Sequence, residues 1–496
     1  MNNINVLLFS NENWKTKYNI PEHINIKAFN GMSLSDRGYK DLVILDRDIN
    51  KLEMEYLQIV TRAYCLVITE NASMTEYTSF INNSKVGKRL YTGDLDSFWI
   101  EAADYYPNPY GEKLNPDFLQ VNQLFKGSIN YYGKYNLVLS GDFGDDFSQI
   151  VYWKNNIPIY EDQCIDLYLE HDKTGDVEIK LRIIHFFNGS VSDIQQIWEF
   201  DSEQLNDVVR IENKKHAGPM FFSIVAKGKG TLRIVSLHDR YSRKDLGFFL
   251  PGGNRYVTEK GEEIFAYFDP GDLKPPLAFY FSGIRKQEGF EGYYMMKKLG
   301  CPFVLITDPR LEGGSFYLGD EDYENLMIDV IKRYMRVFHA NSDQVFFSGS
   351  SMGTFGSLYY ACDIKPHALI LGKPLASLGN VARNETLVRA GTFPTSLDLM
   401  IKEYGSLDDE VINQMNDRFW KKFEKADWSK TKFIMSYLYE DDYDMTAYQD
   451  LLLHLNSEGV QVYGKGIHGR HNDNTDAVLE WFKRQMQNII RDDFRR

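Results

Sequence analysis

A serine between two glycines is the first sign of chemistry in this chain. The segment Gly349-Ser-Ser-Met-Gly353 places Ser351 two residues after one glycine and two residues before another. An apolar, strand-like run precedes the segment, and a helix-like run follows it. Glycines at these spacings remove the Cβ atoms that would clash in a sharp strand-to-helix turn, which leaves the serine hydroxyl exposed. The pattern predicts a nucleophile elbow with Ser351 at its tip, and a tight structural turn is the alternative.

A later cluster of carboxylates supplies the acid that such a serine needs. The predicted strand 432–439 ends in Glu440-Asp-Asp-Tyr-Asp444, so acidic side chains follow its C-terminal end directly. We expect Glu440 to be the acid because it comes first after the strand. Asp441, Asp442 and Asp444 stay open as alternatives, and the carboxylates not used would form a solvated cluster or a helix cap.

Two histidines close together near the C-terminus are candidates for the base. The loop 464–473 carries His468 and His471 and lies between a predicted strand, 460–463, and a final amphipathic helix, 475–490. We expect His471 to be the base because it lies deeper in the loop and nearer the last helix, with His468 as the alternative. The order serine, acid, histidine is the order of the α/β-hydrolases, and each member follows a strand at the edge where such sheets bind ligands.

This arrangement would suit acyl transfer. The histidine would take the Ser351 proton as the hydroxyl attacks an acyl carbon, and the acid would hold the imidazole in the right tautomer. Backbone amides would stabilise the oxyanion. We expect one from Met352, behind the serine, and one from Gly283 in the loop after the first central strand, with Ile284 as the alternative.

The elements around these residues predict an α/β-hydrolase-like domain over 258–496. Strand-like apolar runs alternate with helix-like runs, as a mostly parallel sheet with helices on both faces requires. Between the strands 368–371 and 432–439 the regularity weakens, and the segment 376–428 has the length of a cap over the site.

The first half of the chain predicts two further domains. Residues 1–126 alternate short strands and helices, which indicates a small α/β domain ending in a helical linker, 115–124. Residues 127–257 carry many short strands without helices, which indicates a β-sandwich of jelly-roll type. The aromatic residues of the sandwich are expected to fill its core, and no ligand is indicated for it.

Composition bounds the class of protein. The chain has 496 residues and a net charge of -14, which suits about three domains and argues against a dedicated nucleic-acid binder. Its four cysteines lack C-x-x-C spacing, so neither a zinc site nor a disulfide framework is expected, and no cofactor motif is found. No secretory leader or membrane span is evident, so we expect a cytoplasmic protein, with association at the inner face of the membrane left open.

The three motifs together resemble a known family. The elbow Gly349 to Gly353, the strand end Tyr439 to Asp444 and the segment Gly466 to Asn472 resemble the accessory Sec system protein of Gram-positive cocci that acts as a carbohydrate O-acetyltransferase. That resemblance implies a Ser-Glu-His triad, which falls here on Ser351, Glu440 and His471. The adjacent acids allow an alignment slip of one residue, which leaves Asp441 and Asp442 open.

The same resemblance implies a function and partners. It implies acetylation of N-acetylglucosamine on serine-rich repeat glycoprotein adhesins, and a role in their export with other accessory Sec proteins and the accessory Sec motor. Two alternatives remain. A carboxylesterase or deacetylase would use the same triad with water as acceptor, and a scaffold of the export complex would not use it at all. The acetyl donor and the oligomeric state are not indicated by the sequence.

Overall fold

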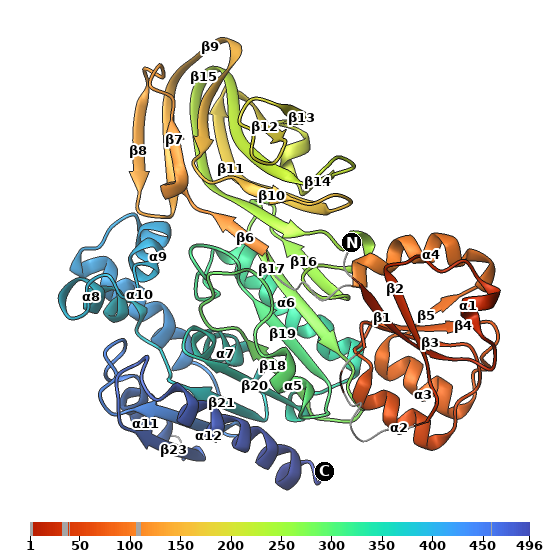
Figure 1. Ribbon diagram of the computed structural model, residues 1–496. Coiled ribbons are helices and arrows are strands. Elements are labelled where there is room, and N and C mark those ends of the chain that lie inside the picture. Colours follow the sequence, from red (N-terminus) through yellow and green to blue (C-terminus); the bar gives the residue numbers. More distant parts are fainter. Residues whose placement is uncertain (1–2, 32–37, 39, 106–110, 458) are drawn as a thin grey trace.

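The computed structural model describes residues 3–31, 38, 40–105, 111–457 and 459–496, and its strands form three sheets. Figure 1 shows the sheet nearest the N-terminus on one side, an antiparallel sheet above, and the largest α/β unit below. The structure therefore combines an α/β-hydrolase-like unit with a β-sandwich and a small α/β unit.

The first sheet is parallel throughout, in the order β2-β1-β3-β4-β5. Its strands are β1 (Ile4–Phe9), β2 (Ile24–Ala28), β3 (Leu42–Leu45), β4 (Leu66–Thr69) and β5 (Lys88–Leu90), and its helices are α1 (Trp14–Lys17), α2 (Lys51–Val60), α3 (Glu76–Lys85) and α4 (Leu95–Glu101). The central strands are near-continuous aliphatic runs because both faces of the sheet are covered.

The second sheet is antiparallel and folds over a core of its own. Its strands are β6 (Gly111–Leu114), β7 (Leu119–Val121), β8 (Ser128–Tyr132), β9 (Asn136–Trp153), β10 (Ile157–Ile159), β11 (Cys164–Gly175), β12 (Glu178–Phe186), β13 (Ile194–Asp201), β14 (Val209–Glu212) and β15 (Gly218–Tyr241). The long strands β9 and β15 run through both layers of the sandwich in Figure 1.

The helical linker expected over 115–124 is wrong. Pro116 begins a single 3-10 turn, and the chain then pairs with β9 as β7. Proline fits the first turn of a helix, but the alternation of buried Leu119, exposed Gln120 and buried Val121 has the period of a strand. The strand β6 also pairs with β15, so residues 111–121 contribute strands to the sandwich sheet.

The third sheet carries the predicted elbow. Its eight strands follow the order β16-β17-β19-β18-β20-β21-β22-β23, parallel from β19 onward. They are β16 (Gly253–Val257), β17 (Glu263–Asp269), β18 (Leu277–Phe281), β19 (Phe303–Thr307), β20 (Val345–Ser350), β21 (Ala368–Gly372), β22 (Lys432–Leu438) and β23 (Val462–Ile467). The carboxyl ends of β18, β20, β22 and β23 therefore meet at one edge.

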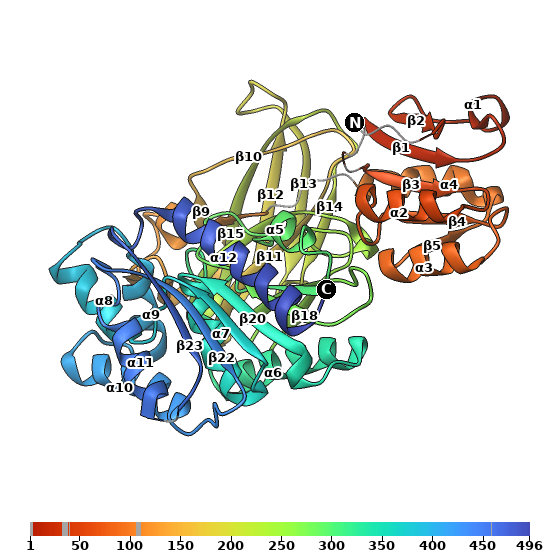
Figure 2. The ribbon, with the colours of Figure 1, turned by 90° about the horizontal axis from the view of Figure 1, so that it is seen from below.

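Helices cover both faces of this sheet. One face packs against α6 (Glu321–Phe338), α7 (Met352–Ile364) and α11 (Ala447–Ser457), and the other against α5 (Tyr293–Lys297) and α12 (Thr475–Asn488). Figure 2 shows α12 lying along the strands on its side of the sheet. Between β21 and β22 the chain forms α8 (Leu378–Leu387), α9 (Thr395–Tyr404) and α10 (Asp409–Phe423), within the segment expected to be a cap.

Buried ion pairs join the sandwich to the hydrolase-like unit. Arg240 of β15 is 1% exposed and bonds Glu263 of β17 at 2.6 Å and Glu288 at 2.7 Å. Burial alone would raise the pKa of Glu288, but Arg240 and His238 hold it well below its usual range. Since Glu288 belongs to the loop after β18, the sandwich fixes a loop that reaches the site.

Candidate active site

Ser351 lies between β20 and α7 with the geometry of a nucleophile elbow. Its backbone has φ 54° and ψ -120°, a conformation that non-glycine residues rarely adopt. A Cβ on Gly349 would lie 2.3 Å from the Gly353 carbonyl oxygen, and a Cβ on Gly353 would lie 2.1 Å from the Phe281 carbonyl oxygen. Neither glycine can therefore carry a side chain in this turn, which explains the spacing seen in the sequence.

His471 faces the serine from the loop between β23 and α12. Its Nε2 lies 2.8 Å from Ser351 Oγ, and its Nδ1 lies 2.8 Å from Asp441 Oδ2. The backbone amide of His471 donates to Asp442 Oδ1 at 3.1 Å, which fixes the loop against the strand end. His468, the alternative base, is 83% exposed and makes no contact with the serine.

The acid on this histidine differs from the expected one. Glu440 is 53% exposed and turns away, to His468 Nδ1 at 3.0 Å and the Gly469 amide at 2.6 Å. Asp441, the next residue and 9% exposed, holds His471 instead. The tight turn after β22, where the Asp441 amide bonds the Leu438 carbonyl, points neighbouring side chains in different directions.

Burial sets the protonation of the histidine. His471 is 1% exposed, and this desolvation lowers its pKa, although the hydrogen bond and the charge of Asp441 raise it in part. The ring is therefore neutral near pH 7, with a proton on Nδ1 for Asp441 and a lone pair on Nε2 for the serine. This is the state that a general base requires.

Side chains that the sequence did not single out pack around the ring. Tyr443 stacks on His471, with ring centroids 4.1 Å apart and planes 8° apart. The guanidinium of Arg389 lies over the far side of Tyr443 at 3.7 Å, and its Nε donates to the Asp442 carbonyl. Arg389 comes from the segment between α8 and α9, so the cap region orders the acid loop. No signal in one sequence pairs residues so far apart.

Asp444, another candidate acid, has a structural role. It is 3% exposed, and its Oδ2 accepts hydrogen bonds from the amides of Ala376 at 2.8 Å and Ser377 at 2.7 Å. Burial raises its pKa to about 7, although the two amides lower it in part. Asp444 therefore joins the acid loop to the start of the cap segment.

The two expected oxyanion amides differ in availability. Met352 begins α7, and its amide has no hydrogen-bond partner in the described part of the chain. The Gly283 amide, by contrast, donates to Glu291 Oε2 at 2.6 Å. The amide of Ile284, the alternative, has no partner among the described residues.

Lys373 is a buried cation beside this site. It follows β21, has φ 58° and is 6% exposed. Burial lowers its pKa, while the charges of Asp441 and Glu291 raise it. Its charge also lowers the pKa of His471, which adds to the effect of burial.

The described residues contain no group of three or more histidines, cysteines or acids able to hold a metal ion. The four cysteines are free thiols. No helix in the described part of the chain has the length and apolarity needed to cross a bilayer.

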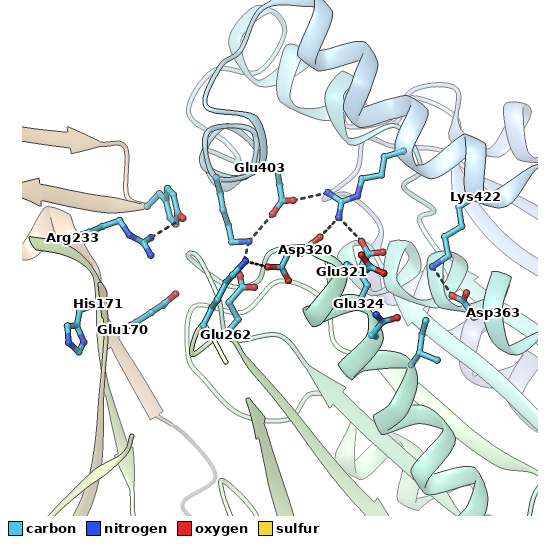
Figure 3. Close-up of a pocket in the computed structure, with 17 residues that line it drawn as sticks. Glu170, His171, Arg233, Glu262, Asp320, Glu321, Glu324, Asp363, Glu403 and Lys422 are labelled. Carbon is cyan, nitrogen blue, oxygen red and sulfur yellow. Dashed lines mark hydrogen bonds and ion pairs between the residues drawn. The ribbon is translucent and has the colours of Figure 1, made fainter. Parts of the chain in front are cut away.

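A cleft of about 750 Å³ opens between the sandwich, α6 and the cap helices. Figure 3 shows Arg233 from the sandwich on one side, Glu403 of α9 and Lys422 of α10 on the other, and Glu324 of α6 below. Most of the charged side chains that line the cleft form ion pairs with one another, as Lys422 does with Asp363 at 2.7 Å. Glu324 accepts from Tyr359, about 12 Å along α7 from the serine, so the cleft lies apart from the triad.

Comparison with known proteins decides the family. The chain matches the family described as "Accessory Sec system GspB-transporter" over residues 4–496. It belongs to this family of accessory Sec system proteins. The family's protein in Staphylococcus aureus (strain NCTC 8325 / PS 47) is 36% identical over 462 residues, 92% of this chain and 88% of that protein. An accessory Sec system protein from Streptococcus gordonii is 40% identical over 387 residues, 78% of this chain and 76% of that protein.

The fold of this accessory Sec family member also has a solved counterpart. A chain of the Glycosylation Associate Protein (Gap123) complex from Streptococcus agalactiae superposes with a TM-score of 0.86 at 36% identity, covering 99% of this chain and 98% of that one. The resemblance to the accessory Sec family noted from the sequence is therefore confirmed.

Proposed function

We propose that the protein is a serine-dependent O-acetyltransferase that acetylates N-acetylglucosamine on serine-rich repeat glycoprotein adhesins. The observation that carries this proposal is the chain of contacts from Ser351 Oγ through His471 to Asp441, with 2.8 Å at each step. A purely structural serine turn has no need of a buried, neutral histidine held by a carboxylate. Asp441 takes the role of triad acid in place of Glu440.

The first half of the reaction forms an acyl-enzyme. Ser351 Oγ attacks the acetyl carbon of a donor, and its proton passes to His471 Nε2. Asp441 stabilises the imidazolium through Nδ1 without taking the proton. The oxyanion is held by the Met352 amide and by an amide of the 283–284 loop. As the bond to the donor's leaving group breaks, His471 returns the proton to that group, which leaves acetyl on Ser351.

The second half needs an acceptor hydroxyl. A sugar hydroxyl gives its proton to His471 and attacks the acetyl group, and Ser351 recovers the proton as it leaves. A transferase must hold the sugar more effectively than water at about 55 M. The cap lies where an acceptor site can form, because Arg389 of this segment contacts the acid loop. The cleft of Figure 3, between cap and sandwich, has room for further sugars of a long acceptor.

The proposal also includes a role for the protein within the accessory Sec complex. Its relative in the Gap123 complex, 36% identical over nearly the whole chain, is part of an assembly, and the family is named for the accessory Sec system. The partners would be other accessory Sec proteins and the accessory Sec motor, at the cytoplasmic face of the membrane. Scaffolding and catalysis can coexist because the triad occupies one sheet of three.

One experiment separates transferase from esterase. Purified protein is given an activated acetyl ester, and acetylation of Ser351 is followed by mass spectrometry, with and without N-acetylglucosamine. We expect the sugar to speed loss of the acetyl group and to appear as its O-acetyl ester. If the rate is unchanged and free acetate is the product, the site is an esterase for that acceptor. If Ser351 is never acetylated, the triad is not catalytic and the scaffold alternative stands.

A further inference from the structure

The N-terminal sheet has a hollow where its strands end. In the order β2-β1-β3-β4-β5 the chain places β2 on one side of β1 and then places β3, β4 and β5 on the other side. Open α/β sheets bind ligands at such a switch point, outside the carboxyl ends of the strands. A cavity of about 700 Å³ lies at this place. Its walls follow three of the strands, with Ser10 and Asn11 after β1, Asp46 and Asp48 after β3, and Asn71 and Ser73 after β4.

Asp46 forms a rigid floor. It is 6% exposed, and its carboxylate accepts four hydrogen bonds. The donors are Ser10 Oγ at 2.6 Å, Trp14 Nε1 at 2.8 Å, Thr69 Oγ1 at 2.7 Å and Asn71 Nδ2 at 2.9 Å. Polar groups that are already fixed lose little freedom when a ligand binds, so the hollow is preorganised.

The charges of the hollow argue against a phosphate ligand. Its two cations are engaged, Lys17 by Glu12 and Arg47 by a bidentate pair with Glu53 at 2.7 and 3.1 Å. The loop after β1 reads Ser-Asn-Glu and contains no glycine to bring backbone amides around a phosphate. With Asp46 ionised and Asp48 beside it, an anion would meet net negative charge.

Other ligand classes fit no better. Every side chain that lines the hollow is polar or charged, so a flat apolar ring would find no partner. The described residues hold no metal-binding group there. Asp46 itself is too buried and too fully bonded to act on a ligand covalently.

We propose that this hollow binds a neutral, polyhydroxylated ligand, namely a sugar unit. Amides and carboxylates on short side chains can pair with the adjacent hydroxyls of a sugar ring, each accepting or donating as the ring requires. Asn11 and Ser73 offer both functions, and Asp48 is held in place by the Ser73 amide at 2.6 Å. The site lies on the first sheet, separate from Ser351 on the third.

A sugar site here would hold a polymeric acceptor. This step rests on the proposed function, in which the substrate carries many sugars on one chain. When one sugar is bound, other sugars on the same polymer reach the triad at an effective concentration that is set by the length of polymer between the two sites. The hollow would thus raise turnover on the polymer and leave turnover on a free sugar unchanged.

The test uses the full chain with Ser351→Ala, which prevents turnover. The probe is the β-linked disaccharide of N-acetylglucosamine, and the readout is the indole N–H signal of Trp14, assigned from Trp14→Phe, because this N–H bonds the floor of the hollow. Asn11→Trp fills the hollow from an exposed position, and Asn83→Trp places the same side chain on an exposed site of α3 outside it.

We expect the Trp14 signal to shift with added sugar until it saturates. The same shift should be seen with Asn83→Trp, and with Asn11→Trp the apparent Kd of the sugar should rise at least about tenfold. If Asn11→Trp lowers Tm, Asp48→Ala replaces it, with the same expectation. No shift with the sugar, equal shifts in both tryptophan variants, or a shift with inorganic phosphate or ADP in place of the sugar would overturn the proposal. In the chain that keeps Ser351, the change Asn11→Trp should leave acetyl transfer to the free sugar unchanged. If the chain that keeps both Ser351 and Asn11 binds the sugar in the hollow but transfers no acetyl group to it, the proposed role of the triad fails and this site stands.

Discussion

The carboxylate of Asp441 lies 2.8 Å from Nδ1 of His471, and the carboxylate one residue earlier does not reach it. A step of one residue along this turn exchanges a solvated carboxylate, Glu440, for a buried one. The buried position is the more effective because the attraction between a carboxylate and a nascent imidazolium is weaker in water than in a protein interior. The acid is thus defined by the direction of a side chain, which a strand-end motif does not encode.

Exchange of the acids is the most direct test of this assignment. Asp441→Asn keeps the shape of the side chain but removes the charge and favours the wrong tautomer of His471, so kcat should fall by about 10⁴-fold. Glu440→Gln, the matched control one residue away, should change kcat by less than about threefold, because an exposed ion pair contributes little. Acetyl release from an activated ester measures both. A larger loss with Glu440→Gln would restore Glu440 as the acid.

Ser351→Ala should separate chemistry from folding. The change removes one hydroxyl and keeps a Cβ in the same backbone conformation, so the free energy of unfolding should change by less than about 1 kcal/mol. Acetyl transfer should fall by about three to six orders of magnitude. Export of the adhesin in cells should continue if scaffolding uses other surfaces. Loss of export with a well-folded variant would show that the two roles are coupled.

The pH dependence of acylation should report the buried histidine. Burial lowers the pKa of His471, and only the neutral ring accepts the serine proton, so activity should fall at acidic pH with a midpoint below the usual value of about 6.5. Because Asp441 raises this pKa in part, the residual activity of Asp441→Asn should have a midpoint at still lower pH. A profile of kcat/KM against pH measures both, and a wild-type midpoint above about 7 would contradict the buried, neutral base.

Glu291 should act on the oxyanion. Its carboxylate accepts a hydrogen bond from the Gly283 amide at 2.6 Å. If that amide holds the oxyanion during the reaction, the negative charge of Glu291 lies close to the negative charge of the oxyanion and destabilises it. Glu291→Gln keeps a hydrogen-bond acceptor and removes the charge, so acylation by an activated ester should become faster, by about two- to tenfold. Single-turnover acetylation of Ser351 measures it. Slower acylation would indicate that the carboxylate holds the loop in its working position.

The elbow could be predicted because its requirements are local. Gly349 and Gly353 are fixed by contacts within a few residues or with the neighbouring strand, and an apolar run before them defines that strand. The order of the three loops then follows from the parallel sheet. The choice between His468 and His471 also had a local basis, since the loop closes against the last helix.

The rest depended on contacts between distant residues. Tyr443 and Arg389 order the histidine from different segments of the chain, and each alone is an ordinary aromatic or basic side chain. Glu291 was not predicted because its distance from the Gly283 amide depends on the path of a loop without regular structure. The helix expected near Pro116 failed for a different reason, because pairing with β9 overrode local preference.

Asp444 should make stability depend on pH. Burial raises its pKa to about 7 in the folded state, against 3.8 for an ordinary aspartate, so the folded protein holds this proton more tightly than the unfolded chain does. By linkage its contribution is complete below pH 3.8 and is lost as the pH rises towards 7. Above that, the fold carries an ionised carboxylate that is 3% exposed.

Asp444→Asn tests this dependence. The amide oxygen of asparagine can accept the hydrogen bonds from Ala376 and Ser377, and the side chain stays neutral at every pH. At about pH 3.5, where Asp444 is protonated in the folded protein and largely so in the unfolded chain, the variant and the wild type should therefore unfold at nearly the same urea concentration. At about pH 8.5 the variant should be more stable by at least about 1 kcal/mol, since each unit of pKa shift corresponds to about 1.4 kcal/mol. Glu440→Gln, which removes an exposed carboxylate from the same turn, should show no such difference. An equal gain at both pH values would mean that Asp444 is ionised throughout, held by the two amides at the start of the cap.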